Sequence, residues 1–478
     1  MRRSMLGTAV VLVMFVVLTA PVAAAAPGDH AWFGSVYSTG GVGDESAVAV
    51  ATDAAGFPIV VGDAVTAAAG DLDIRWASWT LAGDVRWTSV EGFWDNPANP
   101  GARDKATGVV VDDAIGAAYV AGTTEGATTG NDIVLIKVAD GLGGYLPGAV
   151  VWAKTASTAT GRDDEAEAVA MDKSGNVYVT GGTERSDGTM DLVTVKFLPD
   201  GTVAWKLPHN NATTRFDRGL AIAVSGSSVY VAGISDRKGH GDDLVLLKYT
   251  TGGERRWVRY YDDPLNRDES VSGIAVTGSA VYVCGSGKET LTKPGDALLV
   301  KYLNDGTRAW ASWSAGRAGG DDAWIDVAVD AKGRAHVTGY QKRAATGTDI
   351  VTAMYTTGGA MSWGRGYSAT GKGPDVGTAL AVDADGRTYV SGWRTGSDGD
   401  TDMVALKYGT SGTTLWTTAY PDPAGYPIGP YKETDLGDDR ANDVALSGAY
   451  AYVAGGQVWD HGAGFGIDAD VTVVAIKR

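Results

Sequence analysis

One short strand that ends in glycine recurs eight times along the chain, and this recurrence limits the folds open to it. The third copy reads "NVYVTG" and the fourth "SVYVAG". Adjacent copies are 52 to 63 residues apart. A fixed period of this length indicates one supersecondary unit per copy, stacked against its neighbours. The copies end at Gly62, Gly122, Gly181, Gly233, Gly285, Gly339, Gly392 and Gly455.

Each copy contains four alternating or β-branched runs, here called strands a, b, c and d in chain order. In the third copy they are "EAVAM", "NVYVTG", "DLVTVKF" and "TVAW", separated by short turns such as "DKSG" and "PDG". Short turns favour an antiparallel meander, because parallel strands need crossovers of a dozen or more residues. One four-stranded antiparallel meander is one blade of a β-propeller.

The two ends of the repeat array predict how the ring closes. The eighth copy stops after its strand c, "VTVVAIK", and lacks a strand d. A strand with Trp32, "AWFGSVY", precedes the first copy and supplies the missing one. Pairing it with the last blade removes exposed edges. We therefore predict an all-β, eight-bladed propeller, formed by residues 27–478 as a single domain. The other strand d tryptophans are Trp87, Trp152, Trp205, Trp257, Trp310, Trp363 and Trp416.

The repeat resembles that of a known family. The elements "AVD", "GNVYVTG", "VKY" and "DGTxxW" are similar to those of the bacterial secreted β-propeller repeat family (SBBP type), over essentially all of the chain after residue 26. That family usually has seven blades, so eight copies are a departure. Kelch repeats rank second, because only two copies carry their Gly-Gly pair. The SBBP resemblance implies a propeller and transfers no catalytic motif.

The first 26 residues predict an export signal. Arg2 and Arg3 precede an apolar run from Leu6 to Leu18 and the small-residue stretch "PVAAAA". We therefore expect a secreted, extracellular protein without membrane insertion, and a monomer. The formal net charge of −17 is expected to repel nucleic acid. Cys284 is the only cysteine, which excludes an intrachain disulfide.

Five copies carry a lysine in the same column of strand c. This lysine follows an aspartate by five residues, so the two side chains are on opposite faces of the strand. The repetition favours a structural role, with the lysine stem packed over a neighbouring Trp. These residues are Lys137, Lys196, Lys248, Lys301 and Lys407.

Two aspartate columns flank the d-to-a and b-to-c connections, which emerge on one face of the ring, here called the top face. We interpret them first as acceptors of backbone N–H bonds that order these loops. The alternative is calcium held between blades by carboxylates. The segment "DGDTD" resembles the start of a calcium loop. Its candidate ligands are Asp398, Asp400 and Asp402. The sequence thus requires no cofactor and leaves calcium open.

Three long connections on the top face are rich in aromatic residues and belong to blades 7, 8 and 1. Aromatic rings beside carboxylates suit sugars, cationic groups or peptides. This indicates a binding site for an extracellular carbohydrate or protein. The competing interpretation is that the loops fold their aromatics over blade edges. The candidate binding residues are Phe93, Trp94, Tyr426, Tyr431, Trp459 and His461.

An enzyme is the alternative function. Asp326 and Asp443 occupy a strand a column where the other copies carry Ala, Gly or Val. A buried carboxyl group with a shifted pKa can act as a general acid or base. The alternative is therefore a polysaccharide-acting hydrolase or lyase that uses these two residues. We favour a non-catalytic function, since the chain contains no nucleophile elbow, HExxH motif or phosphate loop.

Overall fold

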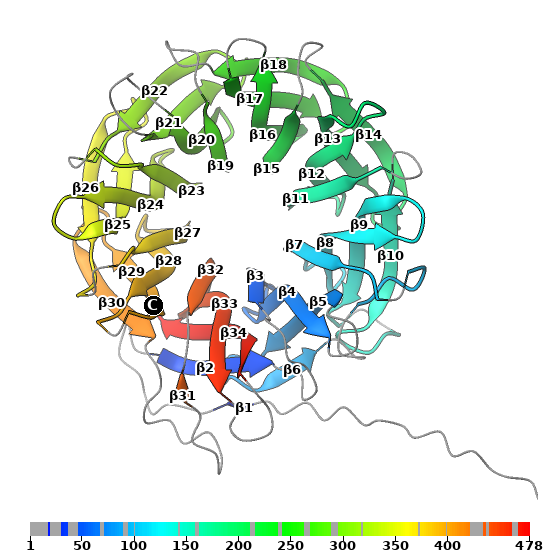
Figure 1. Ribbon diagram of the computed structural model, residues 1–478, viewed down its shortest axis with the longest axis horizontal. Coiled ribbons are helices and arrows are strands. Elements are labelled where there is room, and N and C mark those ends of the chain that lie inside the picture. Colours follow the sequence, from blue (N-terminus) through cyan, green and yellow to red (C-terminus); the bar gives the residue numbers. More distant parts are fainter. Residues whose placement is uncertain are drawn as a thin grey trace, which may run out of the picture.

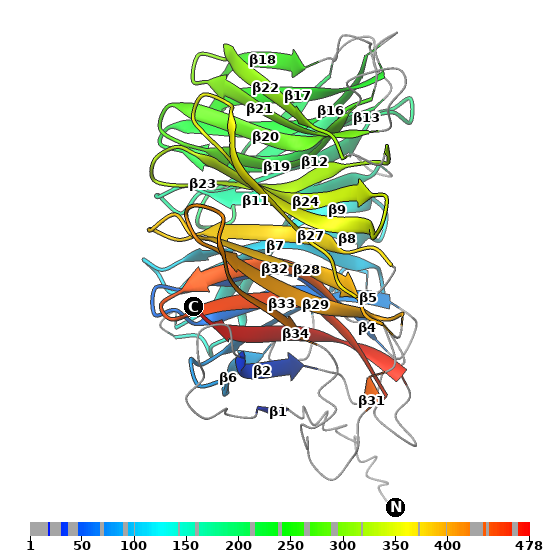
Figure 2. The ribbon, with the colours of Figure 1, turned by 90° about the vertical axis from the view of Figure 1, so that its left-hand side faces the viewer.

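A computed structural model shows a closed ring of eight antiparallel sheets around a central channel (Figures 1 and 2). This confirms the predicted eight-bladed all-β propeller. Among the described residues there is no helix, and hence none that could span a membrane. The structure describes residues 18–19, 30–36, 46–66, 71–88, 94–99, 101–141, 144–157, 162–210, 216–237, 241–261, 268–287, 295–316, 319–370, 373–397, 399–420, 434–435, 439–460 and 467–478.

Seven blades contain four consecutive strands in the order a, b, c, d from the channel outward (Figure 1). Blades 1 to 4 consist of β3 (Ser46–Thr52), β4 (Pro58–Thr66), β5 (Asp71–Trp79) and β6 (Val85–Thr88); β7 (Asp104–Asp112), β8 (Ala117–Gly126), β9 (Gly130–Ala139) and β10 (Val150–Ala156); β11 (Asp164–Met171), β12 (Val177–Glu184), β13 (Met190–Phe197) and β14 (Val203–His209); β15 (Asp217–Ser225), β16 (Ser228–Arg237), β17 (Gly241–Thr250) and β18 (Arg255–Tyr261). Blades 5 to 7 consist of β19 (Ser270–Val276), β20 (Ala280–Gly287), β21 (Asp296–Leu303) and β22 (Arg308–Ser314); β23 (Ala323–Val329), β24 (Ala335–Arg343), β25 (Gly347–Tyr355) and β26 (Met361–Tyr367); β27 (Val376–Val382), β28 (Thr388–Thr395), β29 (Thr401–Tyr408) and β30 (Thr414–Tyr420).

Blade 8 joins the two ends of the chain, as predicted. Its strands β32 (Arg440–Ser447), β33 (Tyr450–Asp460) and β34 (Ile467–Lys477) are completed by β2 (His30–Val36). In this pairing Trp32 is opposite Ala475, and Phe33 is opposite Val474. A two-residue strand, β1 (Leu18–Thr19), pairs with the outer side of β2 and lies within the predicted export signal.

The glycine that ends strand b is required by a bulge in strand a. In all eight blades the register between strands a and b shifts by one residue at the same position, as it does between Gly219 and Ala221 of blade 4. The bulge brings a backbone carbonyl oxygen of strand a close to the glycine of strand b. A Cβ atom added to Gly233 would overlap the carbonyl oxygen of Arg218. The same overlap occurs at all eight glycines. All eight copies therefore have glycine at this position, because the backbone of strand a lies too close to leave room for a side chain.

The tryptophan and lysine columns connect blade 3 to 4, blade 4 to 5 and blade 5 to 6, each through one backbone carbonyl. In blade 4, the Lys248 ammonium lies 5.1 Å from the centre of the Tyr230 ring and donates to the carbonyl of Asn304 at 2.9 Å. Trp257 Nε1 donates to the same carbonyl at 3.1 Å, and Tyr230 donates to the Asn304 side chain at 2.9 Å. The lysine role is thus structural, but the ammonium lies over the strand b tyrosine, where we had expected a Trp.

The inner strands are linked by side chains at and beside the bulge. Thr107 of blade 2 donates to the Ala166 carbonyl of blade 3 at 3.0 Å. At the junction that closes the ring, Asn442 Nδ2 of blade 8 donates to the Ala47 carbonyl of blade 1 at 2.6 Å. Each contact satisfies a backbone acceptor at the channel edge, and together they fix the angle between neighbouring blades.

The bulge explanation predicts that Gly233→Ala is strongly destabilising. The added methyl group meets backbone, which cannot move without breaking the β15–β16 pairing, so we expect a loss of about 3 kcal/mol or more in the free energy of unfolding. Chemical denaturation measures this loss. The control is Gly278→Ala, where a Cβ meets no atom within 4 Å and the change should be near neutral. Equal stability of the two variants would contradict the explanation.

Candidate functional site

Two of the three aromatic connections come together on the top face of blade 8. The chain leaves blade 7 at Tyr420 and returns through β31 (Thr434–Asp435). This short strand pairs with the end of β33, with Asp435 opposite Trp459 and Thr434 opposite Asp460. The connection after blade 7 therefore contacts the b-to-c hairpin of blade 8. The backbone of Trp459 is described but its side chain is not, and Phe93, Tyr426, Tyr431 and His461 lie outside the described residues.

The third connection lies at the boundary between blades 1 and 2. Trp94 forms a bridge with Ile74 of β5, in which its N–H donates to the Ile74 carbonyl at 2.8 Å. The Trp94 side chain is 9% exposed and packs in a cluster with Trp76 and Val134. This is the arrangement that the competing interpretation expected, in which a loop covers a blade edge with its aromatic residue. The described part of this connection does not reach β31.

A half-buried tryptophan beside the two converging connections is the most distinctive side chain of the described top face. Trp393 follows the strand b glycine of blade 7, and the guanidinium of Arg440 from blade 8 lies 4.9 Å from the centre of its ring. Arg440 is exposed. Neither residue was among the candidates predicted from the sequence. The signal was available in the repeat: this column holds Asp63, Thr123, Gly182, Ile234, Ser286 and Gly456 in six blades and an aromatic residue only in blades 6 and 7.

The residue after Trp393 lies on the opposite face of blade 7, toward blade 6. Arg394 Nε contacts Asp402 Oδ2 at 3.0 Å, and Arg394 also reaches the hydroxyl of Tyr367 at 3.5 Å. Asp402, a calcium candidate of the sequence, is thus an ion-pair partner of an arginine. Asp400 is exposed and Asp398 lies outside the described residues. The described part of "DGDTD" therefore forms no cluster of metal ligands.

The two aspartate columns are mostly buried and order the top loops. Asp375 accepts hydrogen bonds from the backbone N–H of Ala369 at 2.7 Å and of Thr395 at 2.8 Å. Burial raises the pKa of its carboxyl, although these two hydrogen bonds act in the opposite direction. Asp322 accepts from the backbone N–H groups of Gly316 and Lys342 in the same way. These contacts match the loop-ordering interpretation of the sequence.

Asp326 and Asp443 connect consecutive blades at their inner strands. Asp326 Oδ2 accepts from the N–H of Leu380 in blade 7 at 2.8 Å. Asp443 Oδ2 accepts from the N–H of Val50 in blade 1 at 2.9 Å, and so contributes to ring closure. The other oxygen of each accepts from the N–H of the following residue at 2.7 Å. The register shows that the other six blades have Ala or Gly in this column.

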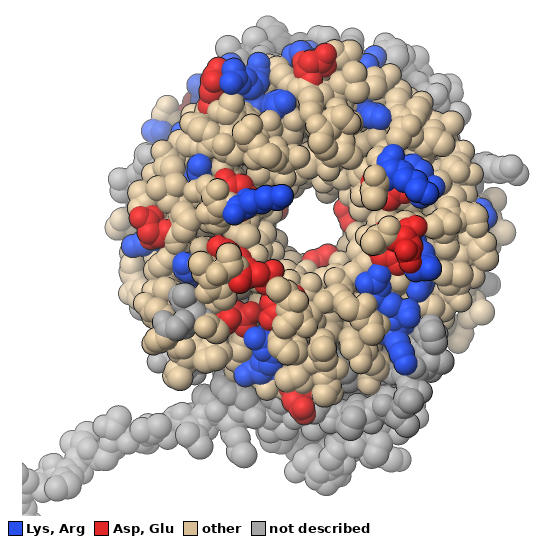
Figure 3. Space-filling model, turned by 180° about the vertical axis from the view of Figure 1, so that it is seen from behind, with Lys and Arg blue, Asp and Glu red and all other residues tan. Residues whose placement is uncertain are grey.

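Both carboxyl groups have raised pKa values. Burial raises the pKa of Asp443 to about 6, the charge of Asp326 adds to this increase, and the hydrogen bonds from Val50 and Val444 oppose it. Burial also raises the pKa of Asp326. The charge of Asp326 is the smallest of the effects on the pKa of Asp443. Acidic side chains are visible around the channel in Figure 3.

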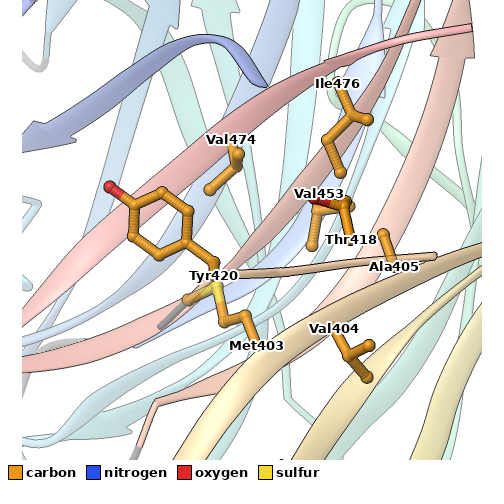
Figure 4. Close-up of a pocket in the computed structure, with 8 residues that line it drawn as sticks. All are labelled: Met403, Val404, Ala405, Thr418, Tyr420, Val453, Val474 and Ile476. Atoms are coloured by element: carbon orange, nitrogen blue, oxygen red, sulfur yellow. The ribbon is translucent and has the colours of Figure 1, made fainter. Parts of the chain in front are cut away.

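A small apolar cavity lies between blades 7 and 8 (Figure 4). Its volume is about 10 Å³, close to the lower limit for one water molecule. Tyr420, Met403 and Val474 are among the side chains that line it. It is too small for a ligand and represents imperfect packing between two blades.

Comparison with known proteins supports the fold alone. No family model matches the chain, and no curated protein does. Solved propellers are similar in shape: the periplasmic gluconolactonase of Pseudomonas aeruginosa is 13% identical, with 79% of this chain and 97% of that chain covered and a TM-score of 0.44. The WD40 domain of SCAP from fission yeast is 9% identical, with 91% and 96% covered and a TM-score of 0.46. A polysaccharide lyase that acts on ulvan is 11% identical, with 91% and 94% covered and a TM-score of 0.40.

The raised pKa of Asp443 predicts a specific pH dependence of stability. A carboxyl with a folded-state pKa near 6 and an unfolded value near 3.8 binds more protons in the folded state between these values, so its contribution to stability grows as the pH falls. From pH 7 to pH 5, the free energy of unfolding of the wild type relative to Asp443→Asn should rise by about 1 kcal/mol. Denaturant titrations at both pH values measure this difference.

Asp383→Asn provides the control, because the pKa of Asp383 is lowered where that of Asp443 is raised. Burial tends to raise the pKa of Asp383, but hydrogen bonds from the Arg387 backbone, Arg478 and Tyr389 outweigh it and lower the pKa below its usual value. The stability that Asp383 contributes is present above the unfolded pKa and lost only in stronger acid. Its difference from the wild type should therefore be flat between pH 7 and pH 5. If the stability difference between the wild type and Asp443→Asn were also the same at pH 7 and pH 5, the conclusion that burial raises the pKa of Asp443 would be wrong.

Proposed function

We propose that this protein is a secreted, non-catalytic binding protein that holds an extracellular or cell-surface carbohydrate on the top face of blades 7 and 8. The observation that carries the proposal is the pair of Trp393 and Arg440, at the place where two aromatic connections of the chain converge. Secretion rests on the export signal predicted in residues 1–26. The SBBP resemblance is compatible with this function.

The chemistry of the site suits a sugar ring. A half-buried Trp presents an apolar surface at low conformational cost, and sugars stack on such rings through their C–H faces. The guanidinium group of Arg440 stacks on this ring and supplies donors for hydroxyl or carboxylate oxygens. An aromatic face and a donor thus lie side by side on two adjacent blades.

The repeat itself argues that Trp393 serves something other than the ring. Six blades close with a small, polar or aliphatic residue in this column, so blade packing does not require an aromatic side chain there. The exposed Arg440 stacks on the Trp393 ring. The blade boundaries without an aromatic residue in this column form without such a contact. The aromatic residue is limited to blades 6 and 7, and a departure limited to part of an eightfold array is where a binding function is expected.

The first test removes the two side chains. Trp393→Ala and Arg440→Ala should each weaken capture on a glycan array, by about tenfold or more in Kd, because each removes a contact worth on the order of 1 kcal/mol or more. Arg440 is exposed, so its variant should keep the wild-type melting temperature. Titration with the captured glycan measures the change in Kd.

The control is Ile234→Ala, a half-buried residue in the same column of blade 4. It should bind as the wild type does. Unchanged affinity in both site variants would remove this site. The wild type could instead bind no glycan but bind a protein, with this binding lost in Trp393→Ala. That result would keep the proposed site and change the class of ligand from carbohydrate to protein.

Polysaccharide cleavage is the second candidate function, and one observation favours it. Burial raises the pKa of Asp443 to about 6, which is useful for a general acid. However, both oxygens of each carboxylate already accept backbone hydrogen bonds. Their contacts therefore favour a structural role.

An activity screen separates the two candidates. Wild-type protein incubated with a panel of neutral and acidic polysaccharides should release no reducing ends and no unsaturated products. Turnover by the wild type that disappears in Asp326→Asn and Asp443→Asn would establish the enzyme instead. Turnover that survives in both variants would exclude these residues as the acid and base.

A further inference from the structure

A buried histidine lies at the outer boundary between blades 3 and 4. His209 is the last residue of β14, the outer strand of blade 3, and is 4% exposed. It follows the strand d tryptophan by four residues, and tyrosine occupies this column in blades 4, 6 and 7. Histidine, unlike tyrosine, has an ordinary pKa of about 6.5. Blade 3 therefore has a ring that titrates in weak acid where three other blades have one that does not.

Both ring nitrogens of His209 contact β18, the outer strand of blade 4. Arg255 Nη1 lies 3.1 Å from Nδ1, and the hydroxyl oxygen of Tyr260 lies 3.1 Å from Nε2. A guanidinium group donates hydrogen bonds and cannot accept them, so Nδ1 must be the acceptor and carry no proton. The proton of the neutral ring is then on Nε2, which donates to the Tyr260 oxygen. The two partners thus select the neutral ring and one of its tautomers.

The other charged and titratable groups at this boundary surround Tyr260. From β15, β16 and β17 of blade 4 they are Asp217, Arg237, Asp243 and Tyr249. The guanidinium of Arg237 lies 4.9 Å from the centre of the Tyr260 ring and pairs with Asp243. On β14 itself, Lys206 has the opposite orientation along the strand and contacts Asp164 of its own blade. A proton on His209 Nδ1 would therefore meet the guanidinium of Arg255 and not a carboxylate.

These surroundings disfavour a charged ring. Burial lowers the pKa of His209 to about 4, and the positive charge of Arg255 adds to this decrease. Protonation of Nδ1 removes the acceptor of the Arg255 hydrogen bond and places two positive charges side by side. Arg255 is exposed, so its side chain has room to turn into solvent. Protonation thus replaces an attractive contact between β14 and β18 with a repulsive one.

The next boundary uses the same two columns without a titratable ring. Tyr261 of blade 4 is in the column of His209, and Arg308 of blade 5 is in the column of Arg255. The Arg308 guanidinium lies 5.0 Å from the centre of the Tyr261 ring. Stacking of an arginine on a phenol ring does not change in weak acid, because neither group titrates there. The boundary between blades 3 and 4 therefore differs from its neighbour in its response to acid.

We propose that His209 is a pH-sensitive switch at the boundary between blades 3 and 4. At neutral pH its ring joins β14 to β18 through Arg255 and Tyr260. In acid, Nδ1 takes up a proton, Arg255 is displaced and the outer part of this boundary opens. The switch is separate from the proposed carbohydrate site, which lies on blades 7 and 8.

The direction of the pH effect follows from the two states of His209. Its pKa is about 4 in the folded protein and about 6.5 in the unfolded chain, so the unfolded chain binds more protons between these values. Stability is therefore complete above pH 6.5 and falls as the pH falls. From pH 7 to pH 5, the unfolding equilibrium constant of the wild type should rise about 20-fold relative to that of His209→Gln, which does not titrate.

The first experiment uses the full chain with 15N-labelled histidines. Two-bond 1H–15N spectra at pH 7 should show His209 with Nδ1 unprotonated and the proton on Nε2, and its titration should have a midpoint near pH 4. His209→Gln identifies the His209 signals by their loss and still offers one acceptor and one donor. A proton on Nδ1 at pH 7, or a midpoint near pH 6.5, would overturn the proposal.

Hydrogen exchange locates the opening. Between pH 7 and pH 5, the protection factors of β14 and β18 should fall in the wild type and remain constant in His209→Gln. Those of β22, the outer strand of blade 5, should remain constant in both proteins. An equal fall in His209→Gln, or an equal fall in β22, would overturn the proposal.

Arg255→Met tests the contact itself, and this exposed residue can be replaced without disturbing the core. Loss of the guanidinium removes both the hydrogen bond to neutral Nδ1 and the repulsion of the charged ring, so the titration midpoint of His209 should rise by about half a pH unit or more. The matched control is Arg308→Met, which should leave this midpoint unchanged. An unchanged midpoint in Arg255→Met, or an equal rise in Arg308→Met, would contradict the assigned role of Arg255 and overturn the switch.

Discussion

The ring depends on one repeated backbone irregularity, the bulge in the innermost strand of each blade. The extra residue directs its side chain toward the next blade, as Thr107 and Asn442 do, and the bulge presses a strand a carbonyl onto the strand b glycine. Where the extra residue can donate a hydrogen bond, as at these two positions, it supplies a partner for a backbone carbonyl of the neighbouring blade. The bulge therefore sets both the composition of strand b and the way in which eight sheets join into a ring.

The outer part of each blade is joined by a different interaction. There the lysine, the strand b tyrosine and the strand d tryptophan meet the carbonyl of the next c-to-d turn, as at Asn304. The lysine ammonium is taken out of bulk water, and burial lowers its pKa where this is resolved, at Lys137. Its position over an aromatic ring and against a carbonyl compensates this loss of hydration. Between blades 2 and 3, for example, the inner contact of Thr107 and the outer contact of Lys137 join the same pair of blades.

Most of the fold could be predicted from the sequence, because every copy of the repeat gives the same evidence. Spacing, turn length and the missing last strand d were enough to predict eight blades and closure by Trp32. The position of the bulge could not be predicted, since bulged and regular strands share the same alternation of apolar residues. Because the bulge was not predicted, the sequence indicated only that Asp326 is an unusual acid in a column of mostly Ala. The structure shows that its carboxylate accepts a hydrogen bond from the Leu380 N–H in the next blade.

The candidate sites were predictable only where copies could be compared residue by residue. Loop aromatics were chosen for their composition, and Trp94 shows the weakness of that choice, since composition cannot distinguish a ring that packs into a blade boundary from one that faces solvent. Trp393 is a better indicator because six of the other blades have a non-aromatic residue in the same column. In a repeat protein the majority residue of a column defines what the scaffold needs. A minority residue with a partner of its own, such as Arg440 for Trp393, therefore carries more information about function than any motif within a single copy.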